Sequence, residues 1–384
     1  MLCATVAAMR PRPHSPGYLP TLDGWRAVAI LALLMDHAPP FPNWMHMHHL
    51  VQNKGALGVN LFFAISGFLI CSRLLGEERS FGRISLRDFY IRRAFRILPA
   101  ALLYLAVIAL LAAAHQLPWD GRAWMGALFF YRNYLHVLHG ASPQNWFTSH
   151  FWSLSVEEHF YLLLPAVLAL LPARRKLMLA SLTALQIGWL FVFLYKRPSG
   201  VTERFWQQRT DLNLCWLLVP ALIALLLQSP AVRLRARVLL QPWVGLLLGL
   251  IATQLNSIAV PFALVIVQPL SLAVLYPLTL VSTVLHPDSL VGRLLEHPAM
   301  RWIARLSYSL YLWQELFFPG WNHYPTLPLH LLQRPGWNLL CVFACAAASF
   351  FLVEQPMIRV GERLTRRPET ESARQPVPPV AEPV

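Results

Sequence analysis

Residues 55–74, GALGVNLFFAISGFLICSRL, are apolar along most of their length, and their one charged residue is Arg73 near the end. The hydrocarbon core of a bilayer is about 30 Å thick and is crossed by a helix of about 20 such residues. Runs of this kind recur from Thr21 to Pro356. The sequence therefore predicts an all-α polytopic membrane protein.

The overall composition supports this prediction. The 384 residues are 56% apolar and 13% charged, whereas a typical soluble domain is about 25% charged. Thirty-two Lys and Arg residues against 18 Asp and Glu residues give a net charge of +14. A nucleic-acid-binding protein would gather such charge on a polar domain with base-contacting motifs, but here the arginines lie between apolar runs. We therefore exclude disorder, most soluble folds and nucleic acid as a partner.

The five cysteines form no CxxC pair, and four of them lie within or at the ends of apolar runs. This distribution is typical of small packing residues, and not of a disulfide framework or a metal site. The sequence therefore predicts neither a bound metal nor a resident cofactor. Residues 1–16, MLCATVAAMRPRPHSP, lack a long apolar stretch and a small-residue cleavage site, so we expect no cleaved signal peptide.

The apolar runs predict ten membrane spans, at roughly residues 22–39, 55–74, 97–114, 150–171, 177–195, 212–228, 238–256, 262–285, 304–320 and 336–357. With the N-terminus inside, 24 of the 32 Lys and Arg residues fall in inner segments and 8 in outer ones. Because positive residues concentrate in cytoplasmic loops, we expect both termini in the cytoplasm.

The domain organisation follows from these spans. We expect a cytoplasmic N-terminal segment at 1–20, one transmembrane domain at 21–358, and a tail at 359–384 that is first basic and then rich in proline. Because the tail cannot bury an apolar face, it is predicted to be disordered.

The apolar stretch 124–138 is not counted as a span, because an eleventh crossing would move the basic residues 174–176 outside. The stretch carries three polar residues, Arg132, Asn133 and His136. Backbone that enters a membrane without crossing it must be covered by protein or line a wet cavity. We therefore expect a half-buried or re-entrant outer segment.

Ionisable residues within spans are costly and indicate function. In the first span, Arg26 and His37 are eleven residues apart, which corresponds to about 16 Å of helical rise and about 20° of rotation. A guanidinium near the inner end and an imidazole near the outer end should therefore look into one cavity, while Asp36 points about 100° away and could orient a neighbour. Alternatively, Arg26 reaches the inner headgroups and His37 is a boundary residue.

A second polar stripe lies in FWSLSVEEHFYLLLP, residues 151–165. Ser153, Glu157 and Tyr161 follow one another at helical spacing, and Glu158 turns aside. Glu157 lies about seven residues, or about 10 Å, below the outer end of its span, so we expect it beside His37, where a carboxylate would stabilise a protonated imidazole. Alternatively, one of the two glutamates bridges to a buried arginine.

The third constellation is ISLRDFYIRRAFRILP, residues 84–99, where Ser85 and Asp88 predict a helix N-cap. Arg92, Arg93 and Arg96 then fall within about 100° of one helix face. Three guanidiniums suit a polyphosphate, because their planar forks bind phosphate oxygens in pairs. Alternatively, the segment is a basic helix that lies on anionic lipids.

A fourth stripe, Ser307, Tyr311 and Gln314, occurs in the ninth span and could line the same cavity or serve interhelical packing.

Other catalytic patterns are missing. His115 and Asp120 match an HxxxxD acyltransferase pattern, but they sit in a short outer loop, so we interpret the match as chance. The sequence contains no GxSxG, HExxH or P-loop motif, which excludes the reactions that depend on them.

Six blocks, in this order, resemble the acyltransferase 3 family of bacterial membrane O-acyltransferases: YLPTLDGWRAVAILALLMDH, GVNLFFAISGFLI, FYIRRAFRILP, FWSLSVEEHFYLLLP, SYSLYLWQ and FLVEQP. The resemblance covers Tyr18 to about Met357. It implies a ten-span domain in the bacterial inner membrane that moves an acyl group, usually acetyl, from cytoplasmic acyl-CoA to a hydroxyl of a glycan or related acceptor.

The resemblance also implies roles for residues. Arg26 and His37 look like the family's Arg-x10-His motif, and Arg92, Arg93 and Arg96 look like its RRxxR motif. Glu157 stands at the glutamate of the SLSVE block. Two positions depart from the family pattern: His159 replaces a frequent glutamine, and Gln314 replaces a frequent histidine. No SGNH-type domain follows the last span, so a second esterase-like step would need a separate periplasmic partner.

Together these observations predict an integral-membrane O-acyltransferase that modifies surface polysaccharide. Its catalytic residues would be His37, as general base or transient acyl acceptor, with Glu157 and Asp36. Acyl-CoA would be the donor substrate, and a glycan or glycolipid would be the acceptor. The donor would be bound by Arg26, Arg92, Arg93 and Arg96. The alternatives are a transporter or flippase for an anionic lipid or glycolipid, a lipid-directed acyltransferase, and acylation of a small-molecule sugar.

Overall fold

The computed structural model describes residues 19–37, 55–139, 143–196, 208–257, 267–318 and 328–365, and within these ranges it contains helices and turns but no strand. The predicted all-α class is therefore confirmed for this part of the chain. The N-terminal segment before residue 19 and the predicted disordered tail from residue 366 lie outside the described residues.

Each of the ten predicted spans overlaps a helix. These helices are α2 (Pro20–His37), α4 (Gly55–Phe81), α5 (Leu86–Ala113), α8 (Phe151–Leu170), α9 (Arg175–Tyr195), α12 (Cys215–Leu226), α14 (Pro242–Ser257), α15 (Val267–Leu285), α17 (Pro298–Phe317), and α18 (Trp337–Ser349), which continues through the π-helix η5 (Phe350–Glu354) into α19 (Gln355–Leu364). Ser85 caps α5 by accepting a hydrogen bond from the backbone of Asp88, as its sequence predicts.

Six helical segments in the described ranges are long and apolar enough to cross a membrane, or seven if α12 and the sharply bent α13 (Pro230–Leu239) count as one. The remaining helices among the ten do not meet this criterion, because they carry too many charged residues or are too short. Helices α2 and α17 each carry three charged residues, and α14 has only 16 residues. The chain is therefore a multi-pass helical membrane protein.

The stretch 124–138 does not form one continuous helix. It is divided between α6 (Gly121–Leu128) and α7 (Arg132–His139), each of eight residues. Phe130 at the break has a φ of 55°, which an α-helix cannot accommodate. Arg132 and Asn133 at the start of α7 are fully buried. Neither helix approaches the roughly 20 residues of a span, in line with the prediction that this segment does not cross.

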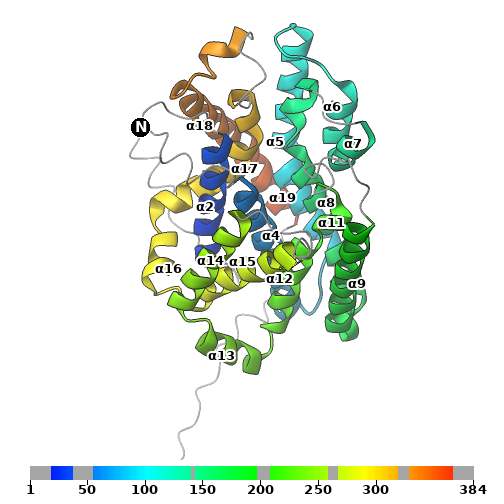
Figure 1. Cartoon of the computed structure of the whole chain (residues 1–384), viewed down its shortest axis with the longest axis vertical. Coiled ribbons are helices and arrows are strands. Elements are labelled where there is room, and N and C mark those ends of the chain that lie inside the picture. The colour runs from blue at the N-terminus through cyan, green and yellow to red at the C-terminus, as the bar shows by residue number, and fades with distance from the viewer. Residues whose placement is uncertain are drawn as a thin grey trace, which may run out of the picture.

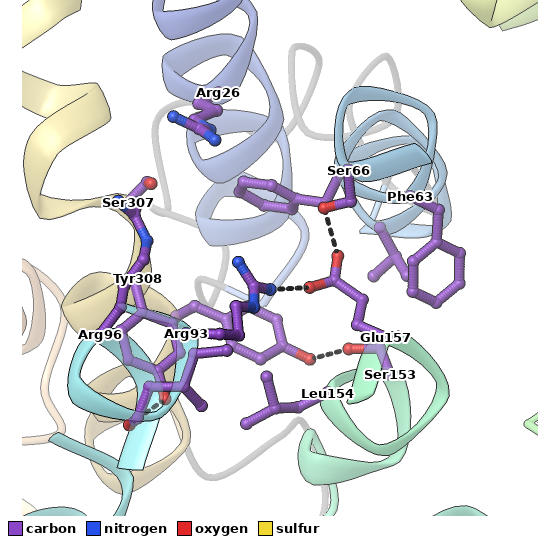
Figure 2. Close-up of a pocket in the computed structure, with 14 residues that line it drawn as sticks. Arg26, Phe63, Ser66, Arg93, Arg96, Ser153, Leu154, Glu157, Ser307 and Tyr308 are labelled. Carbon is purple, nitrogen blue, oxygen red and sulfur yellow. Dashed lines mark hydrogen bonds and ion pairs between the residues drawn. The ribbon is translucent and has the colours of Figure 1, made fainter. Parts of the chain in front are cut away.

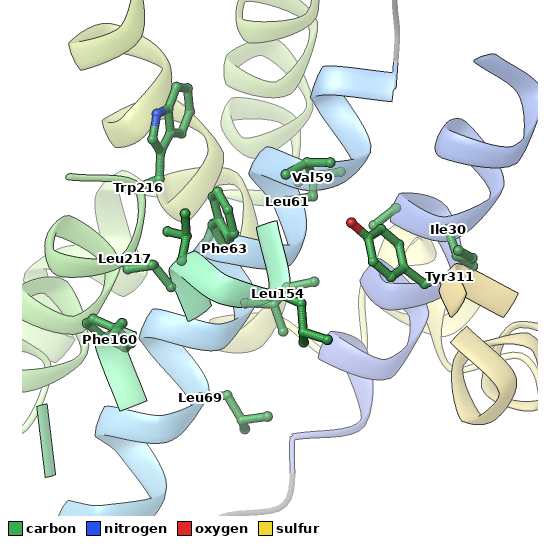
Figure 3. Close-up of a cluster of buried hydrophobic side chains, with 14 of the residues drawn as sticks. Ile30, Val59, Leu61, Phe63, Leu69, Leu154, Phe160, Trp216, Leu217 and Tyr311 are labelled. Atoms are coloured by element: carbon green, nitrogen blue, oxygen red, sulfur yellow. The ribbon is translucent and has the colours of Figure 1, made fainter. Parts of the chain in front are cut away.

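Helices α2 and α4 lie near the centre of the bundle, and α13 lies at the end opposite α6 and α7 (Figure 1). Helix α4 packs against α2 on one side and α12 on another, and α2 also packs against α17. The buried side chains between them come from many helices (Figure 3), among them Ile30, Leu61, Phe63, Leu154 and Leu217. The bundle is thus organised around α4.

Two glycines allow these close approaches. A Cβ at Gly58 would lie 2.5 Å from the backbone oxygen of Ala29 in α2, and one at Gly67 would overlap the backbone oxygen of Leu217 in α12. Small residues at such positions let helix backbones approach closely, which is a common mode of packing in membranes.

We expect Gly67→Ala to destabilise the protein, because backbone cannot give way as a side chain can and overpacking costs about 1 to 3 kcal/mol. The matched control is Gly76→Ala on the same helix, where a Cβ meets nothing within 4 Å and alanine improves helix propensity. Thermal unfolding of the purified variants in detergent checks this expectation. Equal melting temperatures for the two variants would contradict the packing argument.

Candidate active site

A pocket of about 700 Å³, part of it open to the outside, lies where α2, α4, α5, α8 and α17 meet (Figure 2). Its lining includes seven residues that the sequence singled out: Arg26, Arg93, Arg96, Ser153, Glu157, Ser307 and Tyr311. Five separate segments of the chain thus contribute to one cavity with cationic, carboxylate and hydroxyl groups in its wall.

Arg93 and Glu157 form the polar centre of this pocket. The guanidinium of Arg93 lies 3.6 Å from the ring centroid of Tyr161 and 3.6 Å from Glu157 Oε2, and its Nε is 3.8 Å from Glu158 Oε1. Glu157 accepts hydrogen bonds from the hydroxyls of Ser66 (2.9 Å) and Tyr161 (2.8 Å). Buried charges persist when they are paired and hydrogen-bonded in this way.

The predicted pairing of Glu157 with His37 is not what the structure contains. His37 is the last residue of α2 and does not line the pocket. Its Nδ1 lies 3.0 Å from the backbone oxygen of Leu33, and its ring centroid lies 6.4 Å from that of Trp146. Glu157 instead contacts Arg93, since a buried carboxylate gains more from a permanent cation than from an imidazole.

Asp36 lies beside His37 in sequence but points elsewhere. Its carboxylate sits against Gly55 at the start of α4, where a Cβ would approach Asp36 Oδ2 to 2.5 Å. An acidic group near a helix N-terminus is favourably placed relative to the helix dipole. Asp36 therefore connects the end of α2 to the beginning of α4.

The three neighbouring arginines have different surroundings. Arg92 pairs with Glu77 at 3.0 Å, is 40% exposed and lies outside the pocket lining, because one residue step turns a helix by about 100°. Arg93 and Arg96 both line the pocket. Within the described ranges, Arg96 forms no ion pair shorter than 4 Å, whereas Arg26 contacts Asp23 at 3.1 Å.

Several residues at this site were not predicted from the sequence. Ser66 lines the pocket from α4 and donates to Glu157, and a hydroxyl within the apolar run of α4 is the signal that could have found it. Tyr308 lines the pocket and donates to the backbone oxygen of Ile97 (2.9 Å). Glu354, buried in η5, accepts from Ser309 (2.9 Å), and its charge acts on Arg96.

A second polar group of side chains adjoins the pocket near His37. The hydroxyl of Tyr311 donates to the backbone oxygen of His150 (2.6 Å) and lies 2.6 Å from Ser153 Oγ. His150 Nδ1 is 2.8 Å from Glu315 Oε2, and both side chains are almost fully buried. Gln314, predicted to line the cavity, is buried outside its lining.

Arg132 supplies a positive charge to this second group. Burial lowers the pKa of its guanidinium to about 10, while the charge of Glu315 acts in the opposite direction. Arg132 therefore remains protonated at neutral pH. In the part of the chain that the structure describes, no three His, Cys, Asp or Glu side chains are grouped as a metal site would require.

The chain is similar to known acyltransferases in sequence. A family profile described as "Acyltransferase domain" matches residues 19–355. "O-acetyltransferase OatA" of Staphylococcus aureus strain NCTC 8325 is 28% identical over 379 residues, covering 91% of this chain and 58% of that protein. A protein of strain COL named "Putative O-acetyltransferase" is 28% identical over 322 residues, covering 77% and 50%. The chain thus spans about half the length of these curated relatives, and no solved structure matches it significantly.

Proposed function

Because the chain belongs to the acyltransferase 3 family, we propose that it is a membrane O-acyltransferase that moves an acyl group, in the simplest case acetyl, from acyl-CoA to a hydroxyl of a surface glycan. The observation that carries this proposal is the pocket itself, which joins arginines to hydroxyl and carboxylate groups between α2, α5, α8 and α17. The names of the two S. aureus relatives support O-acetylation.

The proposed orientation has ten spans, with both termini in the cytoplasm of a bacterium and the arginines near the inner face of its inner membrane. The overlap of ten helices with the ten apolar runs supports this topology, as does the excess of basic residues in the inner segments. The interrupted stretch 124–138 would then lie at the outer side.

Donor binding is proposed for the arginine end of the pocket. The phosphates of CoA would be held by Arg96, Arg93 and Arg26, of which Arg96 has no close ion pair to break in the described ranges. About 16 Å of helix separates Arg26 from His37. An extended pantetheine arm could roughly bridge that length and carry the thioester toward His37.

His37 is proposed as the general base. Because a carbonyl oxygen can only accept, the contact between Nδ1 and Leu33 assigns the ring hydrogen to Nδ1 and leaves a lone pair on Nε2. Nε2 would take the proton of the acceptor hydroxyl as its oxygen attacks the thioester carbonyl. The C–S bond then breaks, the ester forms, and the departing CoA thiolate takes the proton from His37.

The proposal can be tested with the purified full chain in nanodiscs, supplied with radiolabelled acetyl-CoA and membrane or glycan fractions as acceptors. We expect protein-dependent transfer of label into an ester, and loss of acetyl groups from surface glycans, by mass spectrometry, in cells without the gene. Absence of both acetyl-CoA binding and label transfer would favour the alternative, a transporter of anionic lipids or glycolipids. Label recovered only in a small soluble sugar would replace the glycan acceptor.

A further inference from the structure

Helix α13, Pro230–Leu239, keeps its side chains outside the packed core of the bundle. It contains no buried residue. Leu234, Val238 and Leu239 are 66%, 64% and 70% exposed. Large apolar side chains that gather uncovered on one short helix mark a surface that meets a membrane or another molecule.

The bundle holds α13 through its backbone. The backbone oxygen of Arg237 accepts a hydrogen bond from His286 Nε2 (3.0 Å), in the turn after α15. Ser282 of α15 donates to the backbone oxygen of Gln241 (3.2 Å), which follows the helix. These contacts fix the position of α13 and leave its side chains available to an external partner.

Two observations place α13 at the depth of the lipid headgroups. It lies at one end of the bundle (Figure 1) and bends by 112° from α12, which belongs to an apolar run proposed to cross the membrane. Helix α13 therefore runs more nearly along the membrane plane than across it. Trp243, in the first turn of α14 directly after α13, is 67% exposed, and tryptophans are enriched at the membrane–water interface.

The arginines of α13 flank its apolar side chains. Arg233 and Arg235 each lie about 100° from Leu234 around the helix axis, and Arg237 lies about 100° from Val238. Leu234 and Val238 are four residues apart and share a face. This pattern suits the interface, because the apolar side chains can enter the acyl boundary while the arginine stems extend to the headgroups.

The positive charge of α13 is not balanced within the described part of the chain. No ion pair there includes Arg233, Arg235 or Arg237, and the sequence contains no Asp or Glu between Asp211 and Asp288. The phosphate of a lipid headgroup offers oxygens that guanidinium groups bind in pairs. An anionic lipid is favoured over a zwitterionic one, because the ammonium group of the latter repels the arginines.

We propose that α13 is an interfacial helix that binds the headgroups of anionic phospholipids. Arg233, Arg235 and Arg237 contact the phosphates, and Leu234 and Val238 enter the apolar boundary beneath them. This surface is separate from the pocket and from acyl transfer. The inference requires only that α12 crosses the membrane, so it stands or falls independently of the proposed reaction.

The test places a fluorophore on α13 and asks which lipid surrounds it. Leu234→Cys, a change at an exposed position, is labelled with bimane in the full chain, and the identically treated wild type measures labelling of the native cysteines. The protein is reconstituted into phosphatidylcholine nanodiscs that contain either brominated phosphatidylglycerol or brominated phosphatidylcholine at equal mole fraction. Bromine quenches the label on contact, and iodide added to the water reports aqueous exposure.

We expect brominated lipid to quench the label strongly and iodide to quench it weakly. The apparent affinity for phosphatidylglycerol should exceed that for phosphatidylcholine by about fivefold or more, since one basic residue near an anionic surface already contributes about that factor. The combined variant Arg233→Gln, Arg235→Gln and Arg237→Gln should lose this preference. Its folding should be unaffected, because the three side chains are exposed.

The matched control removes the same charge elsewhere. Arg79, Arg83 and Arg87 are exposed at the connection between α4 and α5, outside the pocket lining and on the same side of the proposed topology. Their combined replacement by glutamine should leave the lipid preference at Leu234→Cys unchanged. An equal loss of preference in both combined variants would overturn the proposal, because net charge and not α13 would then select the lipid.

Two further outcomes would overturn it. Equal quenching by the two brominated lipids would show that α13 touches the acyl chains without selecting a headgroup. Strong quenching by iodide with none by lipid would place α13 in water and assign its arginines to a soluble anion or a protein partner.

Discussion

Replacing His37 with alanine is expected to slow acyl transfer by about 10²- to 10⁴-fold while acyl-CoA binding stays close to that of the wild type. The ring of His37 has one nitrogen engaged with the Leu33 backbone, which leaves the other to receive the acceptor proton. Alanine removes this proton acceptor. It does not touch Arg26, which lines the pocket about 16 Å away along α2, nor Arg93 and Arg96, which line it from α5.

Two measurements are needed, the rate of label transfer from acetyl-CoA and the equilibrium binding of acetyl-CoA to the same preparation. His286→Ala serves as the matched control, because His286 is located in the turn after α15, lies outside the pocket lining, and has its Nε2 3.0 Å from the backbone oxygen of Arg237. It should transfer at the wild-type rate. More than about a tenth of wild-type transfer in His37→Ala would exclude the role of general base.

The features that follow local rules were predictable from the sequence. The cap at Ser85 depends on residues three positions apart, and the apolar runs locate the helices because each helix must satisfy its own backbone in lipid. The exclusion of 124–138 as a span followed from counting charges across the whole chain. In the structure that stretch breaks at Phe130, a detail that no periodicity indicates.

The partners of the site residues were less predictable. Helical spacing identifies which residues of one helix share a face, but it does not say which neighbouring helix that face meets. The helix face that carries Glu157 was therefore predicted correctly, but the partners of Glu157 are Ser66, Tyr161 and Arg93 rather than His37. His150 and Glu315 lie 165 positions apart, and no local signal in the sequence links them.

The neighbours of the three pocket arginines were not predictable from the sequence either, and these neighbours decide which arginine reports on donor binding. Arg93 is a poor probe of donor binding, because its removal would leave the partly buried Glu157 and Glu158 without their cation, and the resulting loss of stability would obscure its effect on affinity. Arg96 lines the same pocket without such a close pair in the described ranges. Its substitution therefore reports on the donor more directly.

We expect Arg96→Ala to weaken acetyl-CoA binding by about 10- to 150-fold, which corresponds to losing one charged hydrogen-bonded contact worth about 1.5 to 3 kcal/mol. Arg92→Ala is the control on the adjacent turn: Arg92 is 40% exposed and engaged with Glu77, so its loss should change the affinity by less than about threefold. Arg96→Lys should fall between them, because an ammonium keeps the charge but not the planar fork. Binding measured at two salt concentrations should show a weaker salt dependence in Arg96→Ala than in Arg92→Ala. If Arg92→Ala weakened binding as much as Arg96→Ala, the CoA phosphates would have to lie on the outer face of α5 rather than in the pocket.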